Sequence, residues 1–229
     1  NVLVALRTYG SGHGARGAAE WSPDRRIVDA LDGAFYAAFS TVEPAGKRTL
    51  MALDVSGSMA QPASGLPISC REVSAALALV TMSTEPAVDV VGFTAGPKWS
   101  NDGWLRGTAL TELAISPQQR LDDAIRVVSD LPFGGTDCSL PMVWAQEQGR
   151  EYDTIIVVTD NETWAGKIHP HQALVQYREH SGIGTRLVVV GMTATDVSIA
   201  NPDDPGMLDV AGMDSAIPTL IADFSRRQI

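Results

Sequence analysis

Oxygen-bearing side chains follow an apolar run near residue 50. In "MALDVSGSMAQ" (51–61) the run ends at Asp54, and hydroxyl side chains follow at every second position, at Ser56 and Ser58. Carboxylates and hydroxyls are hard oxygen donors of the kind that Mg²⁺ and Mn²⁺ bind. The same residue types also cap strand-to-helix turns. This stretch alone therefore leaves a cation site and a capping turn both open.

Two further loops carry similar side chains. The stretch "PFGGTDCSLP" (132–141) places Thr136 and Asp137 just before an expected helix, and Asp160 ends the apolar run "TIIVVTD". Ligands of an open α/β sheet bind outside the carboxyl ends of its strands, so these loops are expected to converge with Asp54 at one edge. Thr136 and Asp160 each also have a simpler interpretation, as a cap and a turn residue. With no imidazole or thiolate in the set, the chemistry favours Mg²⁺ or Mn²⁺ over Zn²⁺.

The elements that must position these residues alternate along the chain. Strands are expected at 48–55, 87–94, 153–160 and 185–192, and helices at 70–85, 116–131 and 169–182. The Val- and Ile-rich runs lack polar alternation, as in strands covered by helices on both faces. The pattern predicts an α/β fold: a doubly wound, mostly parallel sheet flanked by helices. Ser116 with Pro117 is expected to start the second helix, and Gly182 to end the third.

The N-terminal part has a different pattern. "GSGHGARG" (10–17) is a glycine-rich loop, and residues 1–9 fit a strand or a helix end. A helix is expected within 22–42, behind a Ser22 cap and Pro23, and it should pack on the sheet. Its proposed apolar face consists of Ile27, Leu31, Phe35 and Phe39. We therefore expect an N-terminal extension and helix over 1–46, packed on a second region over 47–229.

The C-terminal part is expected to lack a further strand. Residues 199–214, "IANPDDPGMLDVAGMD", form an acidic stretch with two prolines, which favours a loop. A last helix is expected around 214–226. Asp203 and Asp204 in this stretch could bind an extra cation, although an exposed turn is the interpretation that we favour.

Composition limits the classes of function. The chain has 229 residues, 45% of them hydrophobic, with a net charge of −10 and two cysteines. We expect a soluble intracellular protein, because no run approaches about 18 apolar residues, no signal-peptide pattern is present and two cysteines make no disulfide framework. The acidic balance argues against nucleic-acid binding by this chain alone. Because the chain begins with Asn1, we expect a fragment or a processed product.

The order D-x-S-x-S, a distant threonine and a strand-ending aspartate resembles the metal-ion-dependent adhesion site (MIDAS) of von Willebrand factor A domains. That resemblance implies a ligand set of five residues: Asp54, Ser56, Ser58, Thr136 and Asp160. It also implies a von Willebrand factor A, or Rossmann-like, fold over 47–229.

Longer stretches narrow the resemblance. "VEPAGKR", "GGTDCSLPM", "TDNETWAG" with "HP" shortly after, "NPDDPGMLD" and "YGSGHGARG" closely resemble the C-terminal A domain of the Ro autoantigen family of ribonucleoproteins. The resemblance implies that a ring of helical repeats, closed by the A domain, binds Y RNAs and misfolded small RNAs. This sequence lacks that ring, so RNA binding is expected to depend on the full-length protein.

The leading hypothesis is a cytoplasmic, non-enzymatic A domain that binds Mg²⁺ (or Mn²⁺), whose metal accepts an acidic group from a protein or RNA partner. One alternative is a metal-dependent hydrolase on an α/β sheet, for which Glu162 is the nearest candidate base. Another is a structural module that closes the repeat ring, with the cation as a staple. No membrane partner is expected.

Other residues have a functional and a simpler interpretation. His169 and His171 could supply a base or zinc ligands, but a solvated helix start is favoured. Cys138 could be a reactive thiol at a helix N-terminus, but buried packing is favoured. Base stacking and apolar packing are both open to the tryptophans, and packing is favoured because their surroundings are not basic. The tryptophans concerned are Trp99, Trp104 and Trp144.

Overall fold

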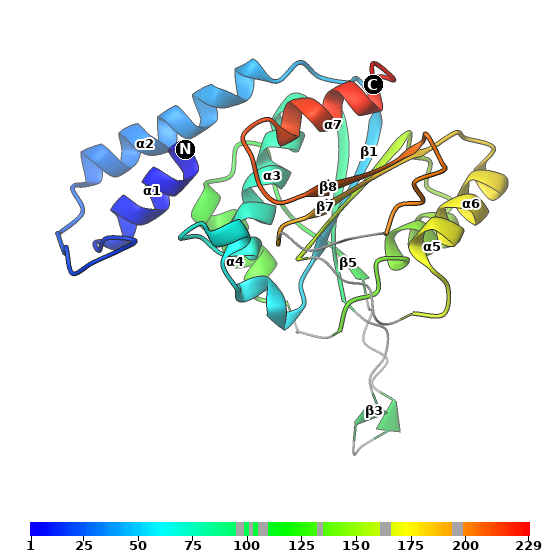
Figure 1. Cartoon of the computed structure of the whole chain (residues 1–229), viewed down its shortest axis with the longest axis horizontal. Coiled ribbons are helices and arrows are strands. Elements are labelled where there is room, and N and C mark those ends of the chain that lie inside the picture. Colours follow the sequence, from blue (N-terminus) through cyan, green and yellow to red (C-terminus); the bar gives the residue numbers. More distant parts are fainter. Residues whose placement is uncertain (95–98, 101–102, 105–109, 132–134, 161–165, 194–198) are drawn as a thin grey trace.

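The computed structural model describes residues 1–94, 99–100, 103–104, 110–131, 135–160, 166–193 and 199–229. The side chains of the short hairpin at 99–104 are outside the described set. Within these residues the chain forms one main sheet with helices on both faces and a helical hairpin beside it (Figure 1). This is the α/β fold that the sequence predicted.

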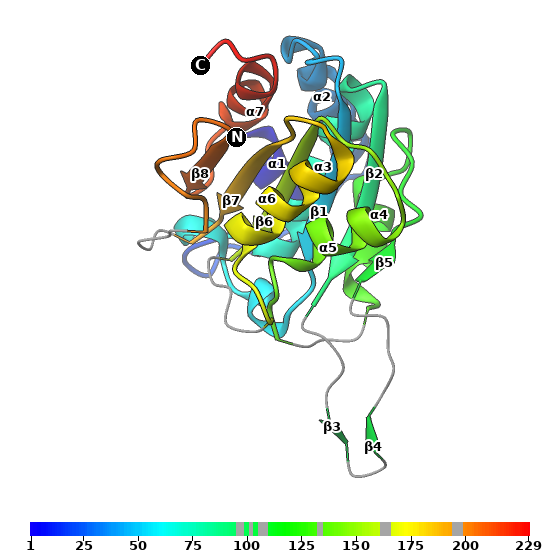
Figure 2. The same cartoon turned by 90° about the vertical axis from the view of Figure 1, so that its right-hand side faces the viewer.

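The sheet has six described strands in the order β5-β2-β1-β6-β7-β8 (Figure 2). They are β1 (Arg48–Asp54), β2 (Ala87–Phe93), β5 (Leu110–Glu112), β6 (Thr154–Thr159), β7 (Arg186–Gly191) and β8 (Met207–Ala211). All neighbouring pairs are parallel except β2 with β5. Strand β1 pairs with β2 on one side and β6 on the other, so the connections diverge between β1 and β6. That position is the switch point at which ligands of such sheets bind.

Alternate side chains of the central strands face two separate cores. Met51 and Leu53 of β1 lie in the cluster that contains helix α3 (Cys70–Thr84) and helix α4 (Leu121–Ser129). Leu50 and Ala52 lie in the cluster on the other face. That second face is covered by α5 (Leu140–Glu147) and α6 (Pro170–Ser181), whereas α7 (Ile217–Ser225) packs with α3. The strands are buried on both faces, which explains their unbroken apolar runs.

Helix α3 begins directly after the loop that follows β1, and its start is fixed by a capping box. Ser69 accepts a hydrogen bond from the Glu72 N–H, and the Glu72 carboxylate accepts one from the Ser69 N–H at 2.8 Å. This reciprocal pair satisfies two N–H groups that a helix start otherwise leaves without partners. The sequence prediction for α3 is confirmed. For α4 the predicted Ser116 cap is wrong, because the helix begins at Leu121 with Arg120 at the cap position.

The N-terminal residues form a helical hairpin of α1 (Val2–Ser11) and α2 (Arg25–Ala37), followed by the 3₁₀ turn η1 (Ala38–Thr41). The choice left open for residues 1–9 is therefore settled as helix. The predicted Ser22 cap of α2 is wrong: Asp24 caps it by accepting from the Arg26 N–H. Phe35 and Phe39 are buried as predicted, but Ile27 is 46% exposed.

Ion pairs join this hairpin to the helices beside the sheet. The Arg7 guanidinium of α1 donates to the Glu72 carboxylate of α3 from Nε at 2.7 Å and also pairs with Asp122 of α4. The Tyr36 hydroxyl of α2 donates to the carbonyl of Gln119 at 2.5 Å. The hairpin thus contacts the same helix that begins beside the Asp54 loop.

The structure corrects the expectation of a loop over 199–214. Residues 207–211 form strand β8, which pairs in parallel with β7 at the edge of the sheet. Leu208, Asp209 and Val210 are only half-buried, and Asp209 interrupts the apolar residues, so the strand does not have the continuous apolar pattern of the central strands. The short strand β5 was also not predicted. A separate hairpin, β3 (Trp99–Ser100) with β4 (Gly103–Trp104), projects from the same end of the sheet as the Asp54 loop (Figure 2).

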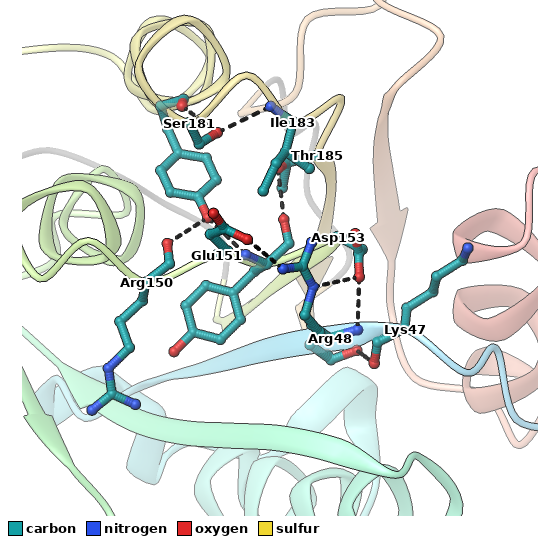
Figure 3. Close-up of polar contacts among 11 residues, drawn as sticks. Lys47, Arg48, Arg150, Glu151, Asp153, Ser181, Ile183 and Thr185 are labelled. Atoms are coloured by element: carbon teal, nitrogen blue, oxygen red, sulfur yellow. Dashed lines mark hydrogen bonds and ion pairs between the residues drawn. The ribbon is translucent and has the colours of Figure 1, made fainter.

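A polar network ties the amino ends of β1 and β6 together at the opposite edge (Figure 3). The Arg48 guanidinium donates to both carboxylate oxygens of Asp153, at 3.0 and 2.9 Å, and also pairs with Glu151. The Arg48 N–H donates to the same Asp153 carboxylate. These bonds fix the register of β1 and β6 at their amino ends, away from Asp54.

None of the helices in the described residues combines the length and the apolar character needed to cross a membrane.

Candidate metal site

Asp54 is the last residue of β1 and its carboxylate is fully buried. Its Oδ1 accepts a hydrogen bond from the Ser56 N–H at 2.7 Å. Its Oδ2 accepts from the Thr159 hydroxyl at 2.8 Å and from the Thr136 hydroxyl at 3.3 Å. A buried carboxylate needs such donors, because its hydration has been lost. The Asp54 side chain thus joins the loop after β1, the loop before α5 and the end of β6.

Strand register explains why Thr159 reaches Asp54. Leu53 of β1 pairs with Val158 of β6, so the next positions, Asp54 and Thr159, are neighbours across the two strands. In both strands these positions continue the alternation that faces helices α5 and α6. The hydroxyl and the carboxylate therefore lie on the same face of the sheet.

Ser56 and Ser58 lie in the turn that follows β1. Their hydroxyl oxygens are 3.0 Å apart, and Ser58 belongs to the 3₁₀ turn η2 (Gly57–Ala60). Ser56 is buried whereas Ser58 is exposed. The alternation of D-x-S-x-S thus places two hydroxyls together beside Asp54, with one of them facing solvent.

Thr136 comes from the loop before α5. Its side chain is buried, and the preceding Gly135 carbonyl accepts a hydrogen bond from the Thr94 hydroxyl at 2.8 Å. The neighbouring Asp137 accepts from the N–H and the hydroxyl of Ser139 at the start of α5. A Cβ on Gly166, whose φ is +107°, would lie only 2.5 Å from Asp137 Oδ1, so glycine is required where this loop passes the next one.

Asp160 follows β6 and is 7% exposed. Its Oδ2 accepts from the Gln61 side chain at 3.1 Å, so it contacts the loop after β1 from the side of α3. Its carbonyl accepts from both the N–H and the hydroxyl of Thr193, which follows β7. Asp160 is therefore held by the loops on both sides of its strand.

Burial raises the pKa of Asp54 to about 6, and the negative charge of Asp160 adds to the rise, although hydrogen bonds from Ser56 and Thr159 oppose it. Burial also raises the pKa of the Cys70 thiol to about 11, with Asp160 and Asp54 again adding to the shift. Burial is the main cause of both shifts, and the charge of a nearby carboxylate adds to each. A cation between the loops would relieve that cost.

The side chains fit a hard divalent cation by their chemistry. The predicted set supplies two carboxylates and three hydroxyls, all oxygen donors, as Mg²⁺ and Mn²⁺ require. In the part of the chain that the structure describes, no group of three or more His, Cys, Asp or Glu side chains is arranged to hold a metal. The residues that would hold Mg²⁺ are thus a mixed set, in which serine and threonine oxygens accompany the two aspartates.

The structure brings the five predicted positions to one edge through direct contacts and shared neighbours. Sequence reasoning missed Thr159 and Gln61, which donate to the two aspartates. The sequence could have indicated Thr159, because it is a polar residue at the end of a mostly apolar strand. Nothing in the sequence indicated Gln61, since its contact with Asp160 depends on the path of the loop after η2.

Comparison with known proteins identifies the family. The profile of the Ro60 vWA domain family matches residues 48–225. The chain belongs to this family. The fold and the family are those that the resemblance in the sequence implied.

Two relatives match all or nearly all of this chain. It is 42% identical over 225 residues to "RNA-binding protein RO60" of Caenorhabditis elegans, covering 98% of this chain and 33% of that protein. It is 41% identical over 231 residues to the protein of the same name from Deinococcus radiodurans, covering 100% of this chain and 41% of that protein. The chain therefore spans only a third to two fifths of these Ro60 relatives.

Solved structures agree with this placement. The crystal structure of the Deinococcus radiodurans RO (RSR) protein superposes with a TM-score of 0.83 at 41% identity, covering 100% of this chain and 44% of that one. Proximal thread matrix protein 1 from the mussel byssus matches with a TM-score of 0.53 at 10% identity over 81% of this chain and 48% of that one. The second likeness concerns the fold alone.

The other candidate residues have surroundings of their own or lie outside the described set. His169 is the cap residue of α6, and its ring centroid is 4.3 Å from that of His171. Cys138 is fully buried, as expected. Trp144 is partly buried against the core, with the Arg150 guanidinium 5.6 Å from its ring centre. Asp204 pairs with Arg178, and Asp203 is exposed; Glu162 and the side chains of Trp99 and Trp104 lie outside the described residues.

Proposed function

We propose that this chain is the metal-binding A domain of a Ro-type RNA-binding ribonucleoprotein. The cation is Mg²⁺ or Mn²⁺, held by Asp54, Ser56, Ser58, Thr136 and Asp160. The observation that carries the proposal is the buried Asp54 carboxylate, which accepts hydrogen bonds from the Ser56 N–H and from the Thr136 and Thr159 hydroxyls, with Asp160 close enough to raise its pKa. A bound divalent cation would supply an electrophilic centre at this edge, and there it would accept an acidic group from a partner.

The residues of the chain have separate tasks in this proposal. Asp54 and Asp160 supply the negative charge, and the three hydroxyls supply neutral oxygens. Thr159 and Gln61 hold the two carboxylates in place by donating to them. Because hydroxyl ligands bring no charge, the cation keeps more of its attraction for an incoming anion than it would among several carboxylates.

RNA binding is proposed for the longer protein rather than for this chain alone. The two relatives are named RNA-binding proteins, and this chain spans 33% of one and 41% of the other. We propose that Y RNAs and misfolded small RNAs are bound mainly by regions beyond these residues, since a net charge of −10 repels a polyanion. A non-enzymatic role and a cytoplasmic location are part of the same proposal.

A thermal melt with and without Mg²⁺ tests the metal site. At about a hundred times its dissociation constant, a cation that binds only the folded chain adds about 2.7 kcal/mol, which raises Tm by about 5–10 °C. Asp54→Asn should abolish the shift, while Asp203→Asn, at an exposed position, should keep it. Asp54→Asn removes a buried negative charge and should fold as well as the wild type in chelator. An identical wild-type melt in Mg²⁺ and in chelator would refute the proposal.

A further inference from the structure

The α1–α2 hairpin lies on the side of the sheet that carries α3 and α4 (Figure 1). Between the hairpin and the start of α4 there is a cavity of about 300 Å³. Its apolar wall consists of Leu6 of α1, Val28 of α2 and Leu121 of α4, and Asp32 of α2 belongs to its polar wall. We call it the interhelical cavity. Its volume is at the lower end of the range for ligand sites, which suits a single side chain.

Asp32 brings a carboxylate with little solvent and no close donor to this cavity. Its side chain is 17% exposed, and its ion pair with Arg120 Nη2 spans 3.7 Å. That distance is too long for a hydrogen bond, and no other side chain or N–H of the described residues donates to this carboxylate. A mostly buried carboxylate without donors is costly, so the cavity favours a ligand that brings N–H groups.

More carboxylates than guanidinium groups surround the cavity. Arg7 and Arg120 line it, and each of them pairs with two carboxylates. The carboxylates are Glu72 and Asp122 for Arg7, and Asp29 and Asp32 for Arg120. A third guanidinium, that of Arg25, is 94% exposed and reaches Asp29 at 3.8 Å. The local balance is negative, on a chain whose net charge is −10, and it therefore favours a cationic ligand.

The end of α1 adds to this negative potential. Its last two residues, Gly10 and Ser11, line the cavity, and its last turn has no basic residue. The carbonyl end of a helix carries a partial negative charge, which a cation stabilises. Helix α4 begins at the same cavity, and a helix start favours anions, but its first turn already carries Asp122 and Asp123. The two helix ends together therefore also favour a cation.

We propose that the interhelical cavity binds a lysine side chain of a protein partner. The ammonium group donates to Asp32, and the aliphatic stem lies along the apolar wall of Leu6, Val28 and Leu121. Lysine matches both walls, because its stem is apolar and its head is a compact charge with three donors. This inference is independent of the metal site.

An NMR titration of the whole isotope-labelled chain, in chelator, tests the proposal. The probe is the terminally blocked tripeptide Gly-Lys-Gly, and the amide signals of Gly10 and Leu121 report on the cavity. We expect Asp32→Asn to weaken binding about three- to tenfold. Asp29→Asn is the matched control: Asp29 is also 3.7 Å from Arg120 Nη2, but it is 51% exposed and does not line the cavity. Its effect should stay below about twofold.

Arg120→Gln separates ligand binding from folding. The Arg120 guanidinium competes with the ammonium group for Asp32, so its loss should tighten the binding of Gly-Lys-Gly about two- to fivefold. Arg120 occupies the cap position of α4, but its side chain makes no capping hydrogen bond, so the helix start should be kept. A gain of affinity requires a folded chain and does not depend on how well Asp32→Asn folds.

Other probes distinguish the lysine site from its alternatives. A wild-type chain that does not bind Gly-Lys-Gly, or Asp32→Asn that binds it equally well, would refute the site. A peptide with norleucine in place of lysine that binds as tightly would leave only an apolar contact. Gly-Glu-Gly that binds more tightly, and depends on Arg120, would make the cavity an anion site. Cadaverine that binds more tightly than Gly-Lys-Gly would replace the protein partner by a small amine.

Discussion

The Thr159 hydroxyl donates a hydrogen bond to Asp54 Oδ2 at 2.8 Å, which joins the last residue of β6 to the last residue of β1. Thr154, at the other end of β6, is equally buried, but its hydroxyl has no hydrogen-bond partner among the described residues. The two threonines of this strand therefore differ in whether the hydroxyl makes a hydrogen bond within the described residues. This difference provides a matched pair of substitutions.

Thr159→Val should destabilise the chain by about 1–3 kcal/mol, because a buried carboxylate loses a donor. Thr154→Val should be neutral or slightly stabilising, since it replaces an unsatisfied hydroxyl with a methyl group of the same shape. Urea denaturation in chelator measures both. Equal effects of the two substitutions would show that the hydroxyl of Thr159 does not support Asp54.

Thr136→Ala should weaken Mg²⁺ binding less than Asp54→Ala does. Water can replace a neutral hydroxyl at a cation, whereas the carboxylate supplies charge that water lacks. Calorimetric titration of the two variants with Mg²⁺ gives the ranking. Equal losses of affinity would mean that Thr136 also holds the loop in shape, through its 3.3 Å hydrogen bond to Asp54.

The network at the opposite edge predicts an acid-dependent contribution to stability (Figure 3). Hydrogen bonds from the Arg48 guanidinium hold the pKa of Asp153 below its usual value, although partial burial opposes them. A carboxylate whose pKa is lowered on folding stabilises the native state above its unfolded pKa of about 3.9, and that contribution is lost as the pH falls through the folded value.

Asp153→Asn should therefore cost about 1–2 kcal/mol at pH 7, and the difference from the wild type should shrink below about pH 4. Glu151→Gln is the control, because Glu151 pairs with the same arginine but is 59% exposed. Its cost should stay under about 0.5 kcal/mol. Urea melts at several pH values test this, and a pH-independent cost for Asp153→Asn would contradict it.

RNA binding by this chain alone should be weak. With 27 acidic against 17 basic residues, its long-range field opposes a polyanion. Affinity for a Y RNA or another single-stranded RNA should be no better than the roughly 10⁻⁴–10⁻⁶ M of non-specific binding. Fluorescence titration at physiological salt with Mg²⁺ present measures it. Nanomolar binding that disappears in Asp54→Ala would instead make the metal edge an RNA phosphate receptor.

The central strands were predictable from sequence because both their faces are buried. In a chain where such runs alternate with helical segments, an almost unbroken apolar stretch such as 154–158 is typical of a strand inside a parallel sheet. Strand β8 was not predictable. Its middle residues are only half-buried and include Asp209, and prolines lie just before it, so its sequence has the pattern of a loop. The Ser116 and Ser22 caps failed for a related reason: each lies near a proline, and the helix starts a few residues later.

The residue types and the order of the candidate site could be predicted from sequence alone, because the aspartates and serines directly follow recognisable apolar strands. The sequence also determined the family resemblance and the acidic charge. Only the tertiary structure decided which partners each group has. Thr159 reaches Asp54 through the register of two strands 105 positions apart. Arg71 reaches Ser56 because the capping box fixes where α3 begins. Such contacts depend on how separate segments pack, and no local pattern encodes that.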